Sequence, residues 1–473
     1  MSSAAIQYAY KNQDKSLKEE NHHPVWYWLL AQLFALWPNW VWISRRMVDG
    51  SDDPLGLMAF GVLGILIWQH RHALRPAPQL LYLCTGLALT LLLAILQNHF
   101  PALLCNLIAM LAVACSIIAF LPRHVAKMPV ILLAILALPI LSSLQFYAGY
   151  PLRVITAEVS RWLLMLFYDV QRDGCTLMVQ GQLIMVDAPC SGVQMAWLGY
   201  FCACTVALWR QLSNTQFLLR LPFVGMLILL GNILRNSALV ILQVSQQQVP
   251  NWLHEGVGIV FLALVCLGIL VLIGSVKPIK NHTTQTTEHT KETIHTLFYS
   301  KQFYKPCLTV FMMCALWGAY DAWAKPVATE KHSAFVEWPH MWEGKMLRPL
   351  ALSEVERRFS NQFPGSIARM TDGKRMFIFR HVTKPTRKLH PAVDCYKGLG
   401  YQISQIQLER NAQSQELWRC FLATRGGQTL RVCEQIKDAH GQSYTDTSAW
   451  YWDAILNPDT GPWQTVTIAE VVL

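Results

Sequence analysis

Three residues in separate parts of the chain could form a thiol active site. Cys190 stands between a strand-like run and a long apolar segment, Arg235 lies inside the next apolar segment, and His254 stands at the head of the one after that. A helix N-terminus beside a thiol favours the thiolate, and a histidine can take and return its proton. An arginine within a membrane span costs about 2.5 kcal/mol or more, so such a residue is expected to be functional. It could stabilise an oxyanion or hold a substrate carbonyl or carboxylate.

Two neighbouring residues could support this site. Ser191 could cap the helix that follows Cys190. Asn232 lies one turn before Arg235 on the same helical face, where it could orient the guanidinium or a substrate. Taken alone, a cysteine at a helix start or a histidine at an interface is usually structural. Their joint placement with an arginine at one membrane face favours a shared function.

The composition places these residues in a membrane protein. The chain has 473 residues, of which 53% are hydrophobic and 14% are charged, whereas soluble proteins carry nearly twice that share of charge. The net charge of +10 does not indicate nucleic-acid binding, because most Lys and Arg residues lie in short loops beside apolar segments, where they set topology. No Cys/His spacing fits a zinc site, and we expect neither a metal nor a cofactor.

The apolar segments predict a mainly α fold with about nine membrane spans and a C-terminal α+β soluble domain. The expected spans are 25–43, 54–69, 79–97, 102–121, 129–148, 191–209, 222–243, 256–275 and 306–323. The expected domains are a polar N-terminal segment at 1–24, a membrane domain at 25–275, a basic loop at 276–305, the ninth span and a soluble domain at 324–473. The first span follows a polar start and has the form of a retained span, not of a cleaved signal peptide.

The distribution of positive charge predicts the orientation. Arginine and lysine in the 69–78 and 122–128 loops place the N-terminus and the 276–305 loop in the cytoplasm, and residues 149–190 and 324–473 outside. This topology brings Cys190, Arg235 and His254 to one level. In the outer segment, 152–168 predicts an amphipathic surface helix with Arg153, Glu158 and Arg161 on its polar side, or else a short re-entrant piece. Residues 175–186 predict a small ribbon that turns at Gly181.

The C-terminal part predicts a helix at 352–359 and strands at 375–381, 401–408 and 416–424. A hairpin is expected about Gly426-Gly427, which suit a type I′ turn. Counting outward from this turn places Cys420 opposite Cys433 at a non-hydrogen-bonded site, where the Cα atoms are about 4.5 Å apart. A disulfide can span that distance, and an oxidising outer compartment would preserve it. Two buried free thiols facing each other are the alternative.

These motifs together resemble the exosortases, multi-span cysteine enzymes of cell-surface protein sorting. The resemblance rests on Cys-Ser-Gly at 190–192, Gly-Asn-x-x-Arg-Asn at 231–236 and His254, and it covers roughly residues 50–275. It implies that Cys190, Arg235 and His254 are catalytic. It also implies a bacterial inner-membrane enzyme that cleaves the C-terminal sorting signals (Pro-Glu-Pro type) of exported proteins, with transfer to an acceptor proposed for the family.

The C-terminal part resembles a soluble domain that is associated with exosortases and sometimes fused to them. The resemblance rests on His390-Pro391-x-x-Asp394-Cys395-Tyr396-x-x-x-Gly400-Tyr401. Cys395 could be a second reactive thiol beside His390, although a structural thiol is the commoner case.

Two other functions fit parts of the pattern. A transporter or lipid-handling channel would use Arg235 as a substrate-binding charge, but it predicts internal repeats and more intramembrane polar residues than the sequence has. A membrane acyltransferase would form a thioester on Cys190, with a lipid in place of a peptide.

Overall fold

The structure is a computed structural model that describes residues 23–48, 53–75, 78–97, 99–186, 191–246, 250–276, 301–324, 336–360, 363–411 and 416–472. The chain forms two compact units. The first contains residues 1–142, 195–231 and 262–325, and the second contains 143–194, 232–261 and 326–473. The predicted domain boundaries remain predictions, and most of the 1–24 and 276–305 segments lies outside the described residues.

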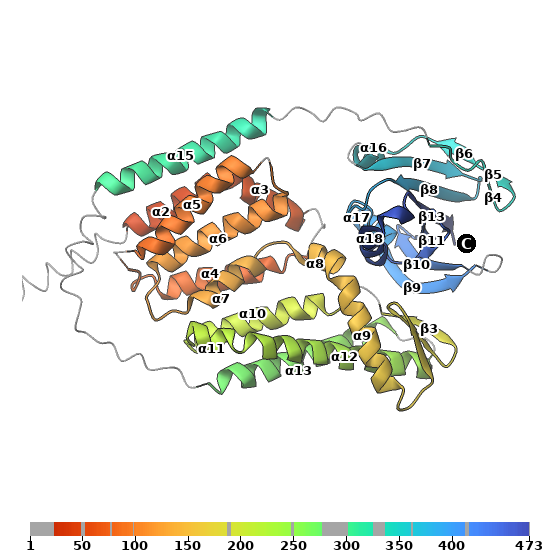
Figure 1. Ribbon diagram of the computed structural model, residues 1–473, viewed down its shortest axis with the longest axis horizontal. Coiled ribbons are helices and arrows are strands. Elements are labelled where there is room, and N and C mark those ends of the chain that lie inside the picture. The colour runs from red at the N-terminus through yellow and green to blue at the C-terminus, as the bar shows by residue number, and fades with distance from the viewer. Residues whose placement is uncertain are drawn as a thin grey trace, which may run out of the picture. The chain divides into compact units, whose positions relative to one another are not determined.

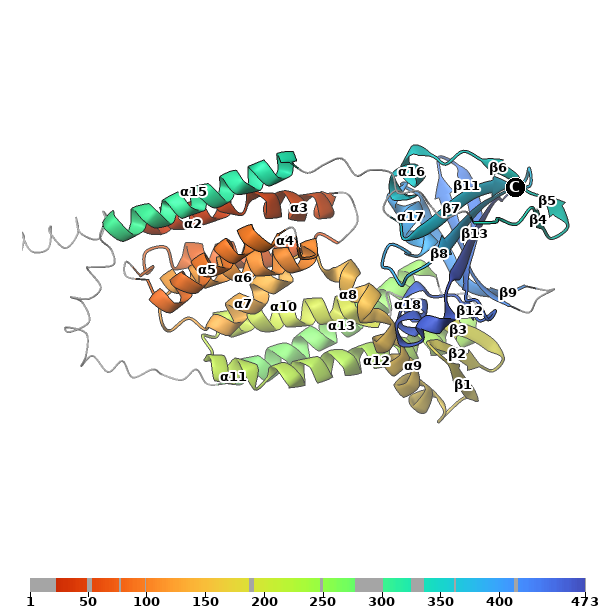
Figure 2. The same ribbon diagram turned by 45° about the horizontal axis from the view of Figure 1, so that its top comes forward.

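The first unit is built from apolar helices (Figure 1). They are α2 (His23–Ala35), α3 (Trp37–Val48), α4 (Gly56–Gln69), α5 (Leu80–Leu96), α6 (Ala102–Phe120), α7 (Lys127–Leu136), α11 (Asn214–Leu218), α15 (Lys301–Ala324) and parts of α10 (Val193–Trp209), α12 (Leu221–Gln246) and α13 (Asn251–Gly274). Figure 2 shows α15 lying along α2 and α3. The Trp28 ring meets Phe311 of α15 edge-on, with centroids 5.0 Å apart.

Hydrogen bonds between helices add to this apolar packing. Gln32 Nε2 donates to Thr90 Oγ1 at 3.2 Å and to the Ala112 carbonyl at 3.2 Å. Trp28 Nε1 donates to Ser116 Oγ at 3.3 Å. Small residues and interhelical hydrogen bonds are what hold helices together in lipid, where burial of apolar surface gives no driving force.

The prediction of nine spans is not confirmed. By length and composition, three helices among the described residues could cross a membrane: 102–120, 214–245 and 252–274. The expected 129–148 span is the bent pair α7 and α8 (Leu141–Tyr147), which meet at 84° and would make a fourth span if counted together. Four further apolar helices at predicted spans, and the apolar part of α15 at 306–320, have only 10–17 residues. Since a helix rises 1.5 Å per residue, these are shorter than the roughly 20 residues that a bilayer requires.

The first part of the second unit leads from α8 into α9 (Gly149–Leu164) and then into an antiparallel ribbon of β1 (Val170–Asp173), β2 (Thr176–Val179) and β3 (Gln182–Met185). The ribbon and its turn at Gly181, where φ is +81°, confirm the prediction. One expectation for α9 is wrong: Glu158 and Arg161 pair at its surface, but Arg153 is buried. Arg153 has a carboxylate partner far along the chain, which the helical pattern does not reveal.

The C-terminal domain of this unit is an antiparallel sheet in the order β6-β7-β8-β13-β11-β10-β9, with β12 beside β11 (Figure 1). Its strands are β6 (Arg348–Leu350), β7 (Gly365–Thr371), β8 (Arg375–Val382), β9 (Gln402–Arg410), β10 (Leu417–Arg425), β11 (Gln428–Lys437), β12 (Ser443–Tyr444) and β13 (Trp463–Val471), and β4 (Met341–Trp342) pairs with β5 (Lys345–Met346). The helices are α16 (Glu354–Ser360), α17 (Ala392–Gly398) and α18 (Thr447–Leu456). Trp450 of α18 packs on Trp463, and Tyr396 of α17 packs on Phe421. The coarse prediction, helices followed by a sheet-rich domain, is confirmed.

The predicted hairpin register is confirmed. β10 and β11 pair with Arg425 opposite Gln428, Thr424 opposite Thr429 and Cys420 opposite Cys433. Gly426 and Gly427 turn the chain with φ of +57° and +81°, which side-chain-bearing residues rarely adopt. The two sulfurs are joined in a disulfide on the face of the sheet that carries Trp418.

The C-terminal domain is joined to α9 through a buried ion pair. Arg153 donates from Nη1 and Nη2 to the two carboxylate oxygens of Asp446 at 2.8 and 3.0 Å, and the two side chains are 3% and 8% exposed. Asp446 also caps α18 by accepting from the backbone of Ser448 and Ala449. Trp452 Nε1 donates to the Tyr147 carbonyl at 2.8 Å. Within this unit, α9 and α18 are therefore held together by a buried ion pair.

Candidate active site

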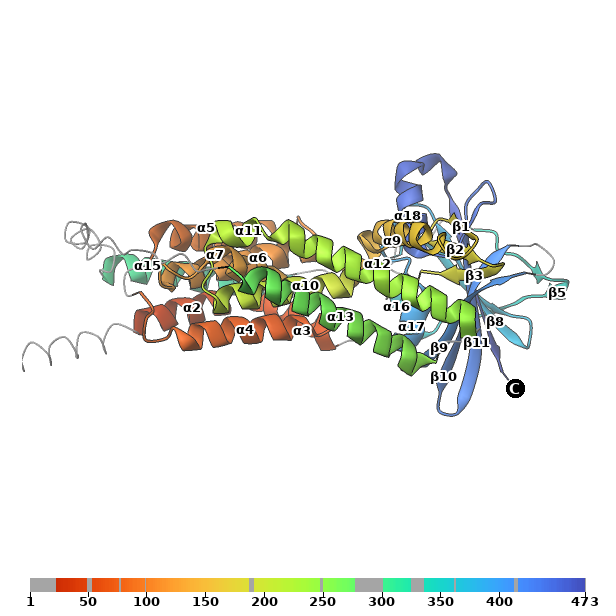
Figure 3. The same cartoon turned by 90° about the horizontal axis from the view of Figure 1, so that it is seen from below.

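The helices α12 and α13 run side by side (Figure 3). The Arg235 side chain of α12 reaches Gly258 of α13. A Cβ atom at Gly258 of α13 would lie 3.3 Å from both Nε and Nη2 of Arg235. The absence of a side chain at Gly258 therefore lets the guanidinium lie directly on the α13 backbone. His254 precedes Gly258 by four residues, so the two share one face of α13, and Arg235 lies close enough to act electrostatically on the His254 ring.

Asn232 and Asn236, which flank Arg235 on α12, are hydrogen-bonded to side chains of α9. Asn232 is 2% exposed, and its Nδ2 donates to Thr156 Oγ1 at 3.2 Å. One turn further along α12, Asn236 Nδ2 donates to Ser160 Oγ at 3.0 Å. Thr156 and Ser160 are themselves four residues apart on α9 and are buried. This pair of matched contacts sets the rotation of α12, and with it the direction in which Arg235 leaves the helix.

The chain that follows Cys190 meets the same part of α12. Gly192 has φ of +80°, and a Cβ atom there would lie 2.9 Å from Cγ and Nδ2 of Asn232. Ser191 is buried, and its Oγ accepts from the backbone of Val193 at 3.4 Å, at the start of α10. Cys190 itself lies outside the described residues. Among the described candidates, the structure brings together Arg235 with His254, and Asn232 with the segment 191–192.

Sequence reasoning missed the residues that make this packing possible. Gly258 and Gly192 permit two close approaches, and Thr156 and Ser160 hold the asparagines. The glycine one turn after His254 was a readable signal, because a small residue beside a candidate catalytic residue permits close packing. No local pattern identifies Thr156 and Ser160, because their partners lie 76 residues away.

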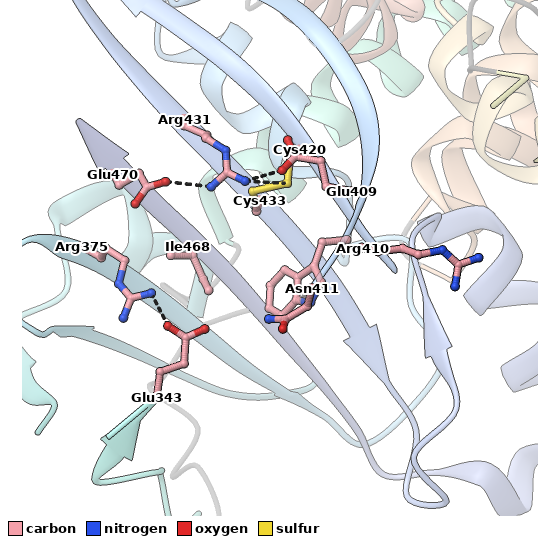
Figure 4. Close-up of a pocket in the computed structure, with 11 residues that line it drawn as sticks. Glu343, Arg375, Glu409, Arg410, Asn411, Cys420, Arg431, Cys433, Ile468 and Glu470 are labelled. Carbon is pink, nitrogen blue, oxygen red and sulfur yellow. Dashed lines mark hydrogen bonds and ion pairs between the residues drawn. A yellow bond between two sulfur atoms is a disulfide. The ribbon is translucent and has the colours of Figure 1, made fainter. Parts of the chain in front are cut away.

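Other places for a ligand are less suited to chemistry. No group of three or more His, Cys, Asp or Glu among the described residues could hold a metal ion. A cavity of about 120 Å³ in the C-terminal domain lies over the Cys420–Cys433 disulfide (Figure 4). Two of the three arginines that line it are paired: Arg431 with Glu470 at 2.7 Å and with Glu409, and Arg375 with Glu343 at 2.6 Å. Ligand pockets usually measure about 300 Å³ or more, so this cavity gives no ligand assignment.

Comparison with known proteins identifies the membrane part of the chain. The family model described as transmembrane exosortase matches residues 42–271, which include Cys190, Arg235 and His254. The match ends before α15 and the C-terminal domain. No curated protein and no solved structure matches the chain. By this match, the part of the chain at residues 42–271 belongs to the transmembrane exosortase family.

Proposed function

We propose that the protein is a membrane-embedded cysteine peptidase or transpeptidase that cleaves C-terminal sorting signals of exported proteins. Cys190 is the nucleophile, His254 the general base and acid, and Arg235 the group that stabilises the oxyanion. Asn232 and Ser191 orient the substrate or the catalytic groups. The reaction takes place at the outer face of the bacterial inner membrane, with the N-terminus in the cytoplasm and the C-terminal domain in the periplasm.

The proposed reaction has two halves. In the first, His254 takes the thiol proton as Cys190 Sγ attacks the scissile carbonyl carbon, and Arg235 binds the negative oxygen of the tetrahedral intermediate. The C–N bond then breaks, His254 protonates the leaving amine, and the exported protein is left as a thioester on Cys190. In the second half, water or an acceptor amine attacks the thioester carbon, the C–S bond breaks, and the Cys190 thiol is restored.

The observation that carries the proposal is the contact of Arg235 with Gly258, one turn beyond His254. A cation inside an apolar helix is costly in lipid, yet α13 presents a glycine where a side chain would push the guanidinium away. An arginine held beside a histidine is the arrangement that oxyanion stabilisation and proton transfer require.

The test is substrate processing in cells that express single variants. Cys190→Ala, Arg235→Ala and His254→Ala should each abolish cleavage while the protein still accumulates in the membrane. Cys84→Ala, which removes an exposed thiol from α5, should cleave normally. Normal processing by Cys190→Ala would refute the thiol mechanism.

A second measurement distinguishes peptide from lipid chemistry. Mass spectrometry of the adduct trapped on Cys190 should show the mass of a substrate fragment ending at the cleavage site. A fatty-acyl mass there would indicate an acyltransferase and would refute the peptidase assignment.

A further inference from the structure

The C-terminal domain contains a cysteine and a histidine in direct contact. His390 Nε2 lies 2.9 Å from Cys395 Sγ, and His390 Nδ1 lies 2.9 Å from the Lys388 carbonyl oxygen. Because that carbonyl can only accept, Nδ1 carries a proton and Nε2 faces the sulfur. In activated cysteine nucleophiles, a histidine base contacts the thiol and a third group orients the histidine. Here the Lys388 carbonyl orients His390 beside Cys395.

The surroundings of His390 favour its protonated form. Burial lowers the pKa of His390, but the hydrogen bond and the charge of Cys395 raise it, and the net effect is a raised pKa. The Phe359 ring of α16 stands edge-on to the imidazole, with centroids 5.5 Å apart at 90°. Cys395 and His390 are both partly exposed.

The sheet beneath α17 and α18 carries a row of polar residues where an apolar core would be expected. Adjacent strands place Arg419 opposite Glu434, Glu434 opposite Thr467, and Arg380 opposite Thr465. Arg380, Arg419, Thr465 and Thr467 are buried, and Glu434 Oε2 accepts from the backbone of Ala392, between His390 and Cys395. Burial of charged groups costs several kcal/mol each. This row therefore indicates a site and not a simple core.

Charged groups from several elements lie near this pair or near its neighbours. The charge of Arg380 on β8 lowers the pKa of both His390 and Glu434. Asp394 of α17 acts on Glu434, and Glu356 of α16 acts on the neighbouring Tyr396. Burial raises the pKa of Glu434 although Arg419 and Arg380 lower it. Arg380 thus links His390 electrostatically to the polar row that contains Glu434.

We propose that Cys395 and His390 form a thiolate–imidazolium pair that exchanges with disulfides, so that the C-terminal domain carries a reactive thiol of its own. In the exchange the thiol proton passes to His390 Nε2, and the thiolate attacks one sulfur of a disulfide. A new S–S bond forms to Cys395, the old S–S bond breaks, and the other sulfur leaves as a thiolate that takes a proton from solvent. This chemistry needs only an accessible thiolate, and the remaining cysteines of the domain, Cys420 and Cys433, are joined to each other.

The site is independent of the proposed peptidase, so it is tested in full-length Cys190→Ala protein, where the other candidate nucleophile is absent. The rate of Cys395 alkylation by iodoacetamide is followed against pH by peptide mass spectrometry. An ordinary thiol of pKa about 8.5 is only about 0.3% thiolate at pH 6. We expect Cys395 to react at least about tenfold faster at pH 6 than in His390→Ala, and the two rates to converge by about pH 9.5.

Matched variants separate this effect from a loss of folding. His440→Ala removes an exposed histidine of the same domain and should leave the rate unchanged. His390→Gln keeps a polar side chain of similar reach without a base, and serves where His390→Ala disturbs the fold. Slow amide hydrogen exchange of β10 and β11 reports the folded domain. Rates within twofold of one another at pH 6 for the parent and the folded His390 variants would overturn the proposal.

The exchange step is tested with glutathione disulfide as the probe. The parent protein should form a glutathione mixed disulfide at Cys395 at pH 6.5, at least about tenfold faster than His390→Gln does. Failure of the parent to form that adduct, under conditions in which iodoacetamide labels Cys395 rapidly, would refute disulfide exchange as the activity of this pair.

Discussion

The Arg153–Asp446 pair gives the sharpest test of how the C-terminal domain is held. The Asp446 carboxylate accepts two bonds from Arg153 and two from the α18 backbone, and both side chains are buried. Removing one partner of such a pair leaves an uncompensated buried charge and costs about 3–5 kcal/mol. Asp446→Asn keeps a good helix cap while removing the negative charge, so we expect a loss of about 3 kcal/mol. Asp446→Ala also removes the cap and should cost about 1 kcal/mol more.

Amide hydrogen exchange of α18 in the full-length protein measures these changes. Since 1.4 kcal/mol is a factor of ten, Asp446→Asn should speed exchange of Thr447–Leu456 by about two orders of magnitude. Asp446→Ala should speed it about fivefold further. Asp459→Asn, which alters an exposed carboxylate just beyond α18, should leave exchange unchanged.

A double variant separates the ion pair from general damage. Replacing both partners of a buried pair with apolar residues is often neutral, so Arg153→Leu with Asp446→Leu should cost less than the sum of the two single changes. Simple additivity, or a change below threefold for Asp446→Asn, would refute the reasoning.

The same pair predicts a pH dependence. Burial alone would raise the pKa of Asp446, but the charge and hydrogen bonds of Arg153 outweigh it and hold the pKa below its usual value. A depressed pKa contributes stability that is present above the unfolded pKa of about 3.9 and is lost as pH falls through the folded pKa. Exchange of α18 should therefore vary little with this group between pH 5 and 8 after correction for intrinsic rates, and should rise below about pH 4. In Asp446→Asn, this acid-dependent rise should be smaller.

Three further predictions concern the site and the topology. Gly258→Val should lower substrate processing at least about tenfold, because the valine side chain would displace the Arg235 guanidinium. The control Gly268→Ala should process normally, since its Cβ would meet Leu227 at an ordinary 3.6 Å. Equal processing rates for the two variants would refute the contact between Arg235 and Gly258. Gly192→Ala combines a strained positive φ with a 2.9 Å approach to Asn232 and should also lower processing at normal protein levels, and unchanged rates would show the approach to be unimportant. Reporters fused at residues 290 and 473 should give signals from opposite sides of the membrane, and same-side signals would contradict the predicted orientation of α15.

Local patterns were sufficient for the elements whose partners are near in sequence. The Gly426-Gly427 turn determines the register of its hairpin, because pairing alternates outward from a two-residue turn, and Cys420 and Cys433 therefore face each other. The ribbon about Gly181 follows in the same way. A cation is rare within an apolar helix, and for that reason the sequence singles out Arg235 as a candidate.

Helix breaks within the apolar segments were harder to predict. The segment 129–148 reads as one span by hydropathy, yet it folds as two helices at 84° with Pro139 between them. Hydropathy measures preference for lipid and does not register the hydrogen bond that proline removes. For the same reason the expected span at 25–43 is divided between α2 and α3, where Pro38 follows the break.

The sequence by itself determined the family, the candidate catalytic residues and the local pairing of strands. Only the tertiary structure decided what surrounds them: that Arg153 is buried against Asp446, 293 residues away, that Thr156 and Ser160 hold the two asparagines of α12, and that Gly258 admits the Arg235 guanidinium. The physical reason is that periodicity and turn residues encode interactions within one element or between neighbours. A polar contact between distant elements depends on how whole helices are rotated and packed, and no single stretch of sequence contains that information.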